Sequence, residues 1–354
     1  MVSNTYLITG GAGFIGSHLA EALLERGASV VVLDDLSTGR AANLRRVAGH
    51  PRLEIAVGSV LDELKVDELA HRCDTIVHLA AAVGVKLIVD EPLRSFTTNI
   101  CGSQIVVGAA HRYRRKILVT STSEIYGKNS AERLSESADR ILGATSVARW
   151  SYSTAKAVEE ILALTYNRER RLPSVVARLF NTVGPRQSPA YGMVIPRLTR
   201  QALAGAPLTV YGDGSQSRCF CHVSDVVAAL VGLLERDEAV GEVFNIGSSE
   251  EVTILELAQR IIEHTGSSSA IQLVPYEQAY AAGFEDMQRR VPDTTKIEEL
   301  LGWRPQRILE DVLCDASNDA RHELDIGDKA ALGVIDVTAD LASLAAVGGA
   351  APPG

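Results

Sequence analysis

The stretch "TYLITGGAGFIGSHLAEALLERG", Thr5 to Gly27, decides the fold. Apolar residues before Gly10 predict a short buried strand, and after Gly16 the apolar positions recur at helical spacing. Between them, Gly10, Gly13 and Gly16 have G-x-x-G-x-x-G spacing. Such a turn lets the backbone approach a pyrophosphate at the positive N-terminus of the helix, so we predict a dinucleotide-binding loop here.

The next apolar stretch outward, "SVVVLDD" at Ser29–Asp35, ends in an acid that bears on the choice of dinucleotide. Asp34 stands 18 residues after Gly16. A carboxylate at the end of this second strand can accept hydrogen bonds from an adenosine ribose diol and would repel a 2′-phosphate. NAD is therefore favoured over NADP, although Arg40, which is close in sequence, weakens that preference.

Further strands alternate with helical stretches. Three more near-continuously apolar runs are predicted as buried strands, at Asp74–Ala81, Lys116–Ser123 and Ser174–Gly184. Alternating strands and helices, with strands apolar on both faces, are typical of a parallel sheet covered on both sides. The predicted fold class is thus α/β, a Rossmann-type doubly wound parallel sheet.

The character of the chain changes after Pro185, where loops rich in Pro, Gly and Ser appear between helical stretches. We predict an NAD-binding domain over 1–185 and a smaller mixed α/β substrate-binding lobe over 186–320, which includes a short strand at Glu242–Ser248. The chain can cross between the two lobes. The stretch 325–354 is Ala/Gly-rich and ends in Pro-Pro-Gly, so it is expected to be a poorly ordered tail.

Bulk composition excludes several function classes. The 354 residues carry a net charge of −9, which disfavours nucleic acids and anionic membranes as partners. We find no apolar run of 18 residues and no signal peptide, so a cytoplasmic protein is expected. The five cysteines are scattered, and Cys219 and Cys221 lack the usual zinc spacing. No metal site is predicted.

Tyr152 and Lys156 form a candidate proton-transfer pair within "RWSYSTAK". Their i, i+4 spacing places both on one face of a helix that begins near Ser151. An ammonium beside a phenol favours phenolate, so we expect the pKa of Tyr152 to be lowered. A tyrosine so tuned can take a proton from a sugar hydroxyl while hydride leaves for NAD⁺.

With these pieces together, the chain resembles the extended short-chain dehydrogenase/reductase superfamily, whose members act on nucleotide sugars. The matching segments are "TGGAGFIGSHL", "HLAA", Asn99, "STSEIYG", "YSTAK", "RLFNTVGPR", "YGDGSQSRCFCHVSD", "VFNIG" and "RRVPD". They follow the family order over roughly residues 5–315. One departure is Ser59, where relatives usually carry Asp, which puts an adenine contact in doubt.

The resemblance implies a set of site residues. NAD would contact Gly10, Gly13, Phe14, Ile15, Gly16, Asp34, Leu79, Ala80, Ala81, Asn99, Tyr152 and Lys156. Thr122 or Ser121 would hydrogen-bond the sugar hydroxyl beside Tyr152. Asn181 and Arg218 would hold the diphosphate, and a guanidinium in a Gly/Ser-rich loop suits that task. For Asn99, a capping or packing role is an alternative to active-site support.

The segment "STSEIYG", Ser121–Gly127, raises the question of what Glu124 does. Family members share oxidation of the sugar C4 hydroxyl and differ afterwards. An epimerase needs no further acid there. A 4,6-dehydratase uses acids in this segment to remove the C5 proton, and a decarboxylase must seat the carboxylate of a glucuronic acid. Glu124 therefore argues against a simple epimerase.

A second segment, "FEDMQRRVPD" at Phe284–Asp293, resembles UDP-glucuronic acid decarboxylases, as do Arg149 and Trp150. The resemblance thus implies a UDP-glucuronate decarboxylase with bound NAD. Thr122 or Ser123 would orient the sugar. Glu124 and Arg290 would act at C5 and C6, with Arg289 as the neighbour that could replace Arg290. We expect either Arg290 between Glu124 and the substrate carboxylate, or Glu124 protonated.

Alternatives remain open at this level. The nearest is a UDP-sugar 4-epimerase on glucose or glucuronate, because the loop Ala81–Val89 differs from typical decarboxylases. A 4,6-dehydratase is next, and a non-catalytic NAD-binding regulator is the outside alternative. The nucleotide, UDP or TDP, and the fate of the 4-keto product, release or reduction to UDP-xylose, are also open. A homodimer is implied, with the Tyr152 helix and the helix near Ile100–Arg112 forming a four-helix bundle.

Overall fold

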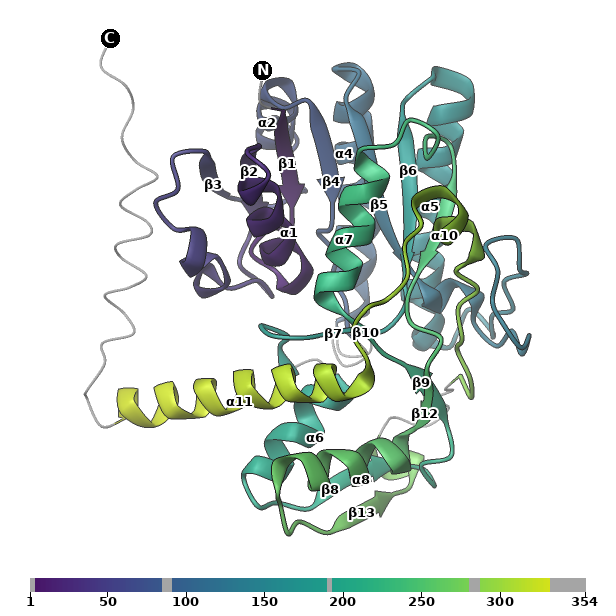
Figure 1. Ribbon diagram of the computed structural model, residues 1–354. Coiled ribbons are helices and arrows are strands. Elements are labelled where there is room, and N and C mark those ends of the chain that lie inside the picture. Colours follow the sequence, from purple (N-terminus) through teal and green to yellow (C-terminus); the bar gives the residue numbers. More distant parts are fainter. Residues whose placement is uncertain (1–3, 85–90, 190–192, 280–286, 332–354) are drawn as a thin grey trace.

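The computed structural model describes residues 4–84, 91–189, 193–279 and 287–331 (Figure 1). Its centre is a seven-stranded parallel sheet in the order β3-β2-β1-β4-β5-β6-β11. The strands are β1 (Thr5–Thr9), β2 (Ser29–Asp34), β3 (Leu53–Val57), β4 (Thr75–His78), β5 (Lys116–Thr122), β6 (Ser174–Leu179) and β11 (Val243–Ile246). The strand order reverses between β1 and β4, as in a Rossmann fold, which confirms the predicted fold class.

Helices cover both faces of this sheet, because strands that are apolar on both sides must be shielded on both. One face carries α1 (Phe14–Glu25) and α7 (Val223–Leu234), with α10 (Thr295–Leu301) beside α7. The other face carries α2 (Glu63–Arg72), α4 (Pro92–Arg112) and α5 (Ser151–Arg170). Each layer encloses its own buried aliphatic core, so the sheet is held from both sides.

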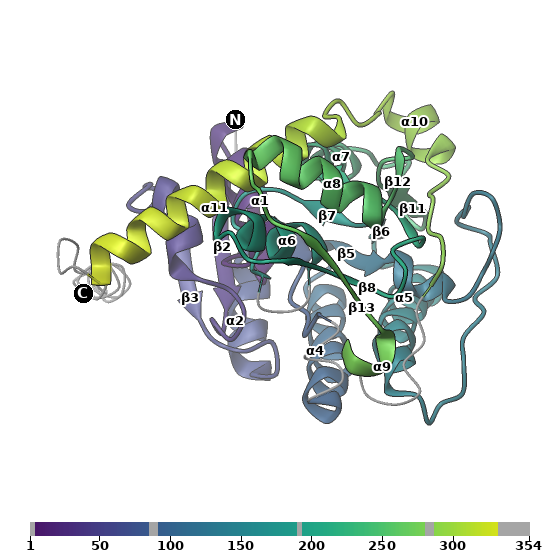
Figure 2. The same cartoon turned by 90° about the horizontal axis from the view of Figure 1, so that it is seen from below.

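The smaller lobe lies beyond the carboxyl ends of the strands, below the sheet in Figure 1. Its elements are α6 (Val194–Leu203), β8 (Leu208–Tyr211), β9 (Ser217–Cys219), β12 (Glu251–Thr253), α8 (Ile254–Thr265), β13 (Ile271–Val274), α9 (Tyr276–Ala279) and α11 (Leu309–Ala331). β8 pairs with β13 and β9 with β12, and α11 runs alongside α6 and α8 (Figure 2). A third buried cluster joins α6, β8, β12, α8 and α11, while β7 (Thr182–Val183) and β10 (Cys221–His222) pair between the lobes.

The chain crosses between the sheet and the smaller lobe after residue 185. α7 and β11 belong to the stretch assigned to the smaller lobe, yet they lie on the main sheet. β3 was not predicted, because at the edge of the sheet none of its residues is fully buried and its apolar run is short. α11 extends to Ala331 and so overlaps the start of the tail predicted over 325–354.

Three predictions from sequence fall partly outside the described residues: the tail from 332, the 85–89 part of the sugar-pocket loop, and 284–286 of the segment that contains Arg290. Among the described helices, none is long and apolar enough to cross a membrane.

Candidate active site

The glycine loop has the geometry that its spacing predicts. Gly10 adopts a φ of +72°, in the left-handed region, and a Cβ there would lie 2.7 Å from the backbone nitrogen of Ala80. A Cβ on Gly16 would lie 2.3 Å from the Gly10 carbonyl oxygen. Helix α1 begins at Phe14 with no side chain capping its N-terminus. The exposed backbone N–H groups and the absence of side chains form a cradle that fits a pyrophosphate.

Asp34 fastens this loop from the end of β2. Its Oδ2 accepts a hydrogen bond from the Ala12 backbone nitrogen at 2.9 Å, and its Oδ1 accepts one from Leu36 at 2.8 Å. Each oxygen keeps a further lone pair that a ribose diol could use. Arg40, the residue that could have favoured a 2′-phosphate, bonds Glu323 of α11 at 2.9 Å. The arrangement therefore fits NAD.

A cavity of about 490 Å³ opens between the glycine loop and the smaller lobe. It lies at the carboxyl ends of β1 and β4, where the strand order reverses, which is the usual ligand position in such sheets. The residues predicted from sequence that line it are Gly10, Gly13, Phe14, Ile15, Gly16, Asp34, Leu79, Ala80, Ala81, Ser121, Thr122, Ser123, Glu124, Tyr152, Lys156, Asn181, Arg218 and Arg290. The fold thus brings together segments from both lobes.

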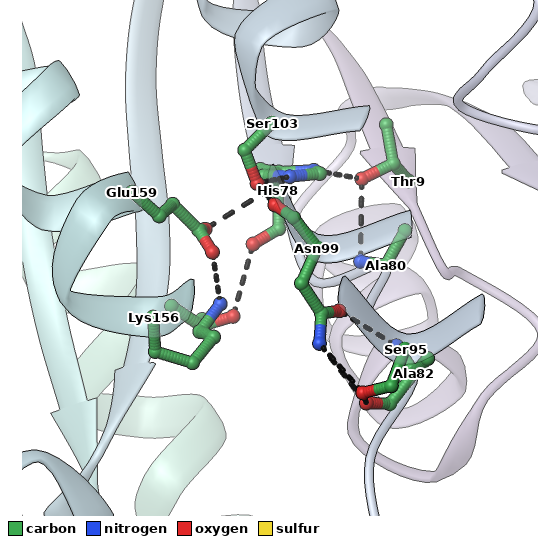
Figure 3. Close-up of polar contacts among 10 residues, drawn as sticks. Thr9, His78, Ala80, Ala82, Ser95, Asn99, Ser103, Lys156 and Glu159 are labelled. Carbon is green, nitrogen blue, oxygen red and sulfur yellow. Dashed lines mark hydrogen bonds and ion pairs between the residues drawn. The ribbon is translucent and has the colours of Figure 1, made fainter. Parts of the chain in front are cut away.

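Asn99 does not line the cavity but supports its wall. From α4, its Oδ1 accepts from the Ala82 backbone nitrogen at 2.8 Å, and its Nδ2 donates to the Ala82 carbonyl at 3.1 Å (Figure 3). It is 1% exposed. This two-point clamp holds the loop after β4, which carries Ala80 and Ala81, and it corresponds to active-site support through backbone contacts.

Arg289 is not brought into the cavity, so its nomination as a substrate ligand needs correction. Its guanidinium bonds the Glu251 carboxylate, with contacts of 2.8 and 2.9 Å, and the Glu132 carbonyl, and the side chain is 39% exposed. Arg290, one residue later, lines the cavity. Ser59 also stays outside the lining, where its hydroxyl accepts from Leu61.

Glu124 lies at the centre of a buried ion cluster. It belongs to η2 (Ser123–Tyr126), whose N-cap Thr122 accepts from the Glu124 backbone nitrogen. Arg149 donates from both Nη atoms to the two carboxylate oxygens, at 2.8 Å for Oε1. Arg290 donates to the same Oε1 at 3.1 Å. Arg149 comes from η3 (Ala148–Trp150), directly before α5, so the cluster joins three segments that are far apart in sequence.

These contacts decide the ionisation of Glu124. Burial by itself raises the pKa of this carboxyl, but Arg149 and Arg290 outweigh it and lower the pKa to about 2. The structure has Arg290 beside an ionised Glu124, so the alternative of a protonated Glu124 is not found. Arg149 was noted in the sequence only for its resemblance. Its position three residues before Tyr152 was the available signal for its place in the cavity.

Tyr152 lies beside this cluster with Thr122, whose side chain hydrogen-bonds the phenol. The lowered pKa that the Lys156 spacing predicted is not found. Burial is the main influence and raises the pKa of Tyr152, and the charges of Glu124 and Glu159 raise it further. Lys156 directs its ammonium to Glu159, three residues on, so its charge is largely offset.

On the side of the smaller lobe, Arg218 and Asn181 are both fixed by backbone carbonyls. Arg218 donates to the Ser217 oxygen at 2.7 Å, and Asn181 donates to the Cys219 oxygen at 3.3 Å. Arg197 also lines the cavity, 4.4 Å from the Tyr211 ring centroid, and sequence reasoning missed it. The described residues contain no cluster of three His, Cys, Asp or Glu that could hold a metal ion.

Comparisons with known proteins point to one family. Residues 7–316 match the family described as GDP-mannose 4,6 dehydratase. UDP-N-acetyl-alpha-D-glucosaminuronate decarboxylase of Bacillus cytotoxicus is 43% identical, over 84% of this chain and 92% of the relative. UDP-glucuronic acid decarboxylase 5 of Arabidopsis thaliana is 37% identical over 90% of each chain. UDP-glucuronic acid 4-epimerase of Bacillus cereus, solved with UDP-glucuronic acid and NAD, has a TM-score of 0.81 and 29% identity, over 90% of this chain and 99% of that one.

Proposed function

The chain belongs to the GDP-mannose 4,6-dehydratase family, and from that premise we propose that it is an NAD-dependent decarboxylase of a UDP-linked glucuronic acid. This family membership confirms the resemblance to nucleotide-sugar enzymes that the sequence motifs indicated. The relatives act on UDP-glucuronate and on its 2-acetamido counterpart, so the substrate class is a UDP-linked uronic acid. The NAD-bound neighbour and the Asp34 cradle support NAD as the cofactor.

The observation that carries this proposal is the ion cluster beside Tyr152. Two buried guanidinium groups face one ionised carboxylate, Glu124, so the cluster keeps a net charge of +1. Arg149 is 3% exposed and Arg290 8%, and buried charges interact strongly. A C6 carboxylate would be attracted to these two guanidinium groups, whereas a neutral hexose carries no charge for them to bind.

In the first step, Tyr152 acts as the base. Its phenolate takes the proton from the C4 hydroxyl, and Thr122, which hydrogen-bonds the phenol, holds the reacting oxygen in line. The glycine loop and Asp34 would hold NAD, which would supply the acceptor of the C4 hydride. Arg218 and Asn181, held by carbonyls of the smaller lobe, bind the substrate diphosphate.

Oxidation at C4 makes the C6 carboxylate part of a β-keto acid. The C5–C6 bond breaks, CO₂ leaves, and the electron pair moves through C5 to the C4 oxygen as an enolate, which then takes a proton at C5. Arg149 and Arg290 orient the carboxylate. While the substrate shares these arginines, their hold on Glu124 weakens and its pKa rises, so that Glu124 can take part in proton transfer only then.

The test is incubation of the protein and NAD⁺ with UDP-glucuronate, and separately with UDP-N-acetylglucosaminuronate. Mass spectrometry should show a product lighter by CO₂, and proton NMR at C4 distinguishes a ketone from a pentose. A product of unchanged mass and inverted C4 would make the protein an epimerase and refute decarboxylation. Tyr152→Phe should abolish turnover while NAD binding persists.

We also propose that the protein works as a homodimer through α4 and α5. Four apolar side chains on these helices are exposed: Leu93 (79%) and Phe96 (38%) on α4, and Val158 (40%) and Ile161 (58%) on α5. Within each helix the pair is spaced i, i+3 and so shares a face. Two copies could cover these faces in a four-helix bundle. Light scattering should give twice the chain mass, and Ile161→Glu should give the monomer.

A cytoplasmic location is proposed on the state of the cysteines. All five lie in the described part of the chain, and all five are free thiols. Burial raises the pKa of Cys73 to about 11 and of Cys219 to about 12, which makes these thiols unreactive. Localisation of a tagged chain in its own cell would test this assignment.

A further inference from the structure

One helix turn after Tyr152, α5 carries a buried ion pair, Lys156 and Glu159, which faces β4 and α4. Glu159 follows Lys156 by three residues on α5, and its Oε2 accepts from the Lys156 ammonium. Glu159 is 1% exposed and Lys156 2%. Lys156 also lines the cavity, so the pair reaches from the cavity floor to the α4 side of the helix (Figure 3).

The other oxygen of Glu159 receives no hydrogen bond from the described residues. Its neighbours are His78 on β4, with Nε2 at 3.9 Å, and the hydroxyl of Ser103 on α4. Ser103 directs its only proton to the Asn99 carbonyl at 2.6 Å, so it accepts from His78 Nε2–H at 3.0 Å. Both neighbours therefore make these hydrogen bonds to other groups. The Ser103 hydroxyl still helps to lower the pKa of Glu159, but Lys156 is the larger influence of the two.

His78 cannot offset the carboxylate by becoming charged. With Nε2 donating to Ser103, the neutral ring leaves Nδ1 to accept from the Thr9 hydroxyl at 2.7 Å. Burial, together with the Lys156 charge, lowers the pKa of His78 to about 3. The next residue on α5, Glu160, is bonded to Arg178 of β6. Within the described part of the chain, Lys156 and Glu159 therefore form an ion pair with no further charged partner.

The groups that face Tyr152 come from four elements. They are Thr122 on β5, Glu124 on η2, Arg149 on η3 and Glu159 on α5. The two carboxylates disfavour a phenolate there, whereas the charge of Arg149 and the hydrogen bond from Thr122 favour it. The i, i+4 spacing predicts that the Lys156 ammonium stabilises the phenolate of Tyr152. Because Glu159 binds that ammonium, its positive charge is offset.

We propose that Glu159 is a positioning residue of the active site, which anchors the Lys156 ammonium at the cavity floor and offsets its charge, so that Glu159 determines the basicity of Tyr152. The inference rests on the proposed role of Tyr152 as the base. Glu159 is a buried carboxylate in addition to Glu124, and burying it with one oxygen that accepts no hydrogen bond costs free energy. Its control of the charge beside Tyr152 accounts for its presence.

The test measures the phenol directly in cofactor-free protein. Tyr152 is replaced by 3,5-difluorotyrosine, which is intrinsically more acidic, and its ionisation is followed by ¹⁹F NMR against pH. In Glu159→Gln, the pKa should fall by about one unit, because a neighbouring negative charge is lost and Lys156 becomes uncompensated. Glu159→Asp, which keeps the charge but shortens the reach to Lys156, should shift the pKa in the same direction by less.

The matched control is Glu160→Gln. It removes an equally buried carboxylate from the next position of the same helix, but one paired with Arg178. Its phenol should titrate as in the parent. If Glu159→Gln and Glu159→Asp both titrate with the parent, or if Glu160→Gln shifts the phenol as much, the inference is wrong.

The pH dependence of the reaction rate provides a second test of the role of Glu159. In Glu159→Gln the base is weaker but more readily ionised, so the rate should be about threefold lower than the parent's on the plateau. On the acidic limb, a tenfold larger ionised fraction outweighs that loss and the rate should be about threefold higher, so the two pH profiles cross. A general structural defect would lower the rate at every pH and would count against the inference. If the parent itself turns over no UDP-uronate, the proposed function fails, while the fluorine titration still decides the role of Glu159.

Discussion

Replacing Glu124 with glutamine removes the charge that holds two buried arginines together while keeping the size of the side chain. In the parent, burial raises the pKa of Glu124, but Arg149 and Arg290 outweigh it and bring the pKa from 4.5 to about 2. At about 1.4 kcal/mol for each unit of pKa, that difference corresponds to about 3 kcal/mol. Glutamine mimics the protonated carboxyl, so the variant should lose about 3 kcal/mol of unfolding free energy at pH 7.

The pH dependence has a definite sign. Because the pKa of Glu124 is lower in the folded state, its contribution is complete above pH 4.5 and is lost as the pH falls through about 2. The difference between parent and variant should therefore be constant from pH 8 to pH 5. About half of it should remain at pH 3.

Urea unfolding followed by tryptophan fluorescence measures this difference, since Trp150 adjoins Arg149. Glu251→Gln is the control, because Glu251 also bonds a guanidinium, that of Arg289, but at the surface. It should cost about 0–1 kcal/mol. A loss in Glu124→Gln that is no larger than in this control, or that is unchanged between pH 7 and pH 3, would refute the electrostatic reasoning.

Three further changes test the cofactor site. Gly16→Ala should cost about 1–3 kcal/mol of stability and most of the NAD affinity, since its Cβ would meet the Gly10 carbonyl at 2.3 Å; urea unfolding and calorimetry of NAD binding measure both, and parent-like values would contradict the cradle. Asn99→Ala should cost about 1–3 kcal/mol of stability and should weaken NAD binding, because the Ala82 N–H loses its partner and the Ala82 carbonyl keeps only the Ser95 hydroxyl; a thermal shift without loss of NAD affinity would show that the clamp serves only packing. Asp34→Asn should weaken NAD binding about tenfold and reduce the ratio of NAD to NADP affinity, because the carboxylate that repels a 2′-phosphate is lost. Competition binding measures both affinities, and an unchanged ratio would show that Asp34 does not recognise the ribose.

The main sheet and the cofactor loop could be predicted because their signals are local. Each buried strand is a continuous apolar run, and the G-x-x-G-x-x-G turn needs only neighbouring residues to adopt its shape. β3 was not predicted because it lacks such a local signal. It lies at the edge of the sheet and is a strand because it pairs with β2, not because it is buried. β11 was recognised as a strand, but only the tertiary fold placed it beside β6.

The sequence by itself determined the features that depend on neighbouring residues. The placement of Tyr152 and Lys156 on one helix face is such a feature, because one turn of helix sets it. Tertiary structure alone decided which charges meet. Arg290 and Arg289 are adjacent and alike in sequence, yet only Arg290 lies in the cavity with Glu124. The pKa of Tyr152 moved opposite to the local expectation, because long-range packing buried the phenol and put carboxylates around it. Spacing along a chain predicts faces and turns, whereas burial and the partners of a charge depend on segments brought together from far apart.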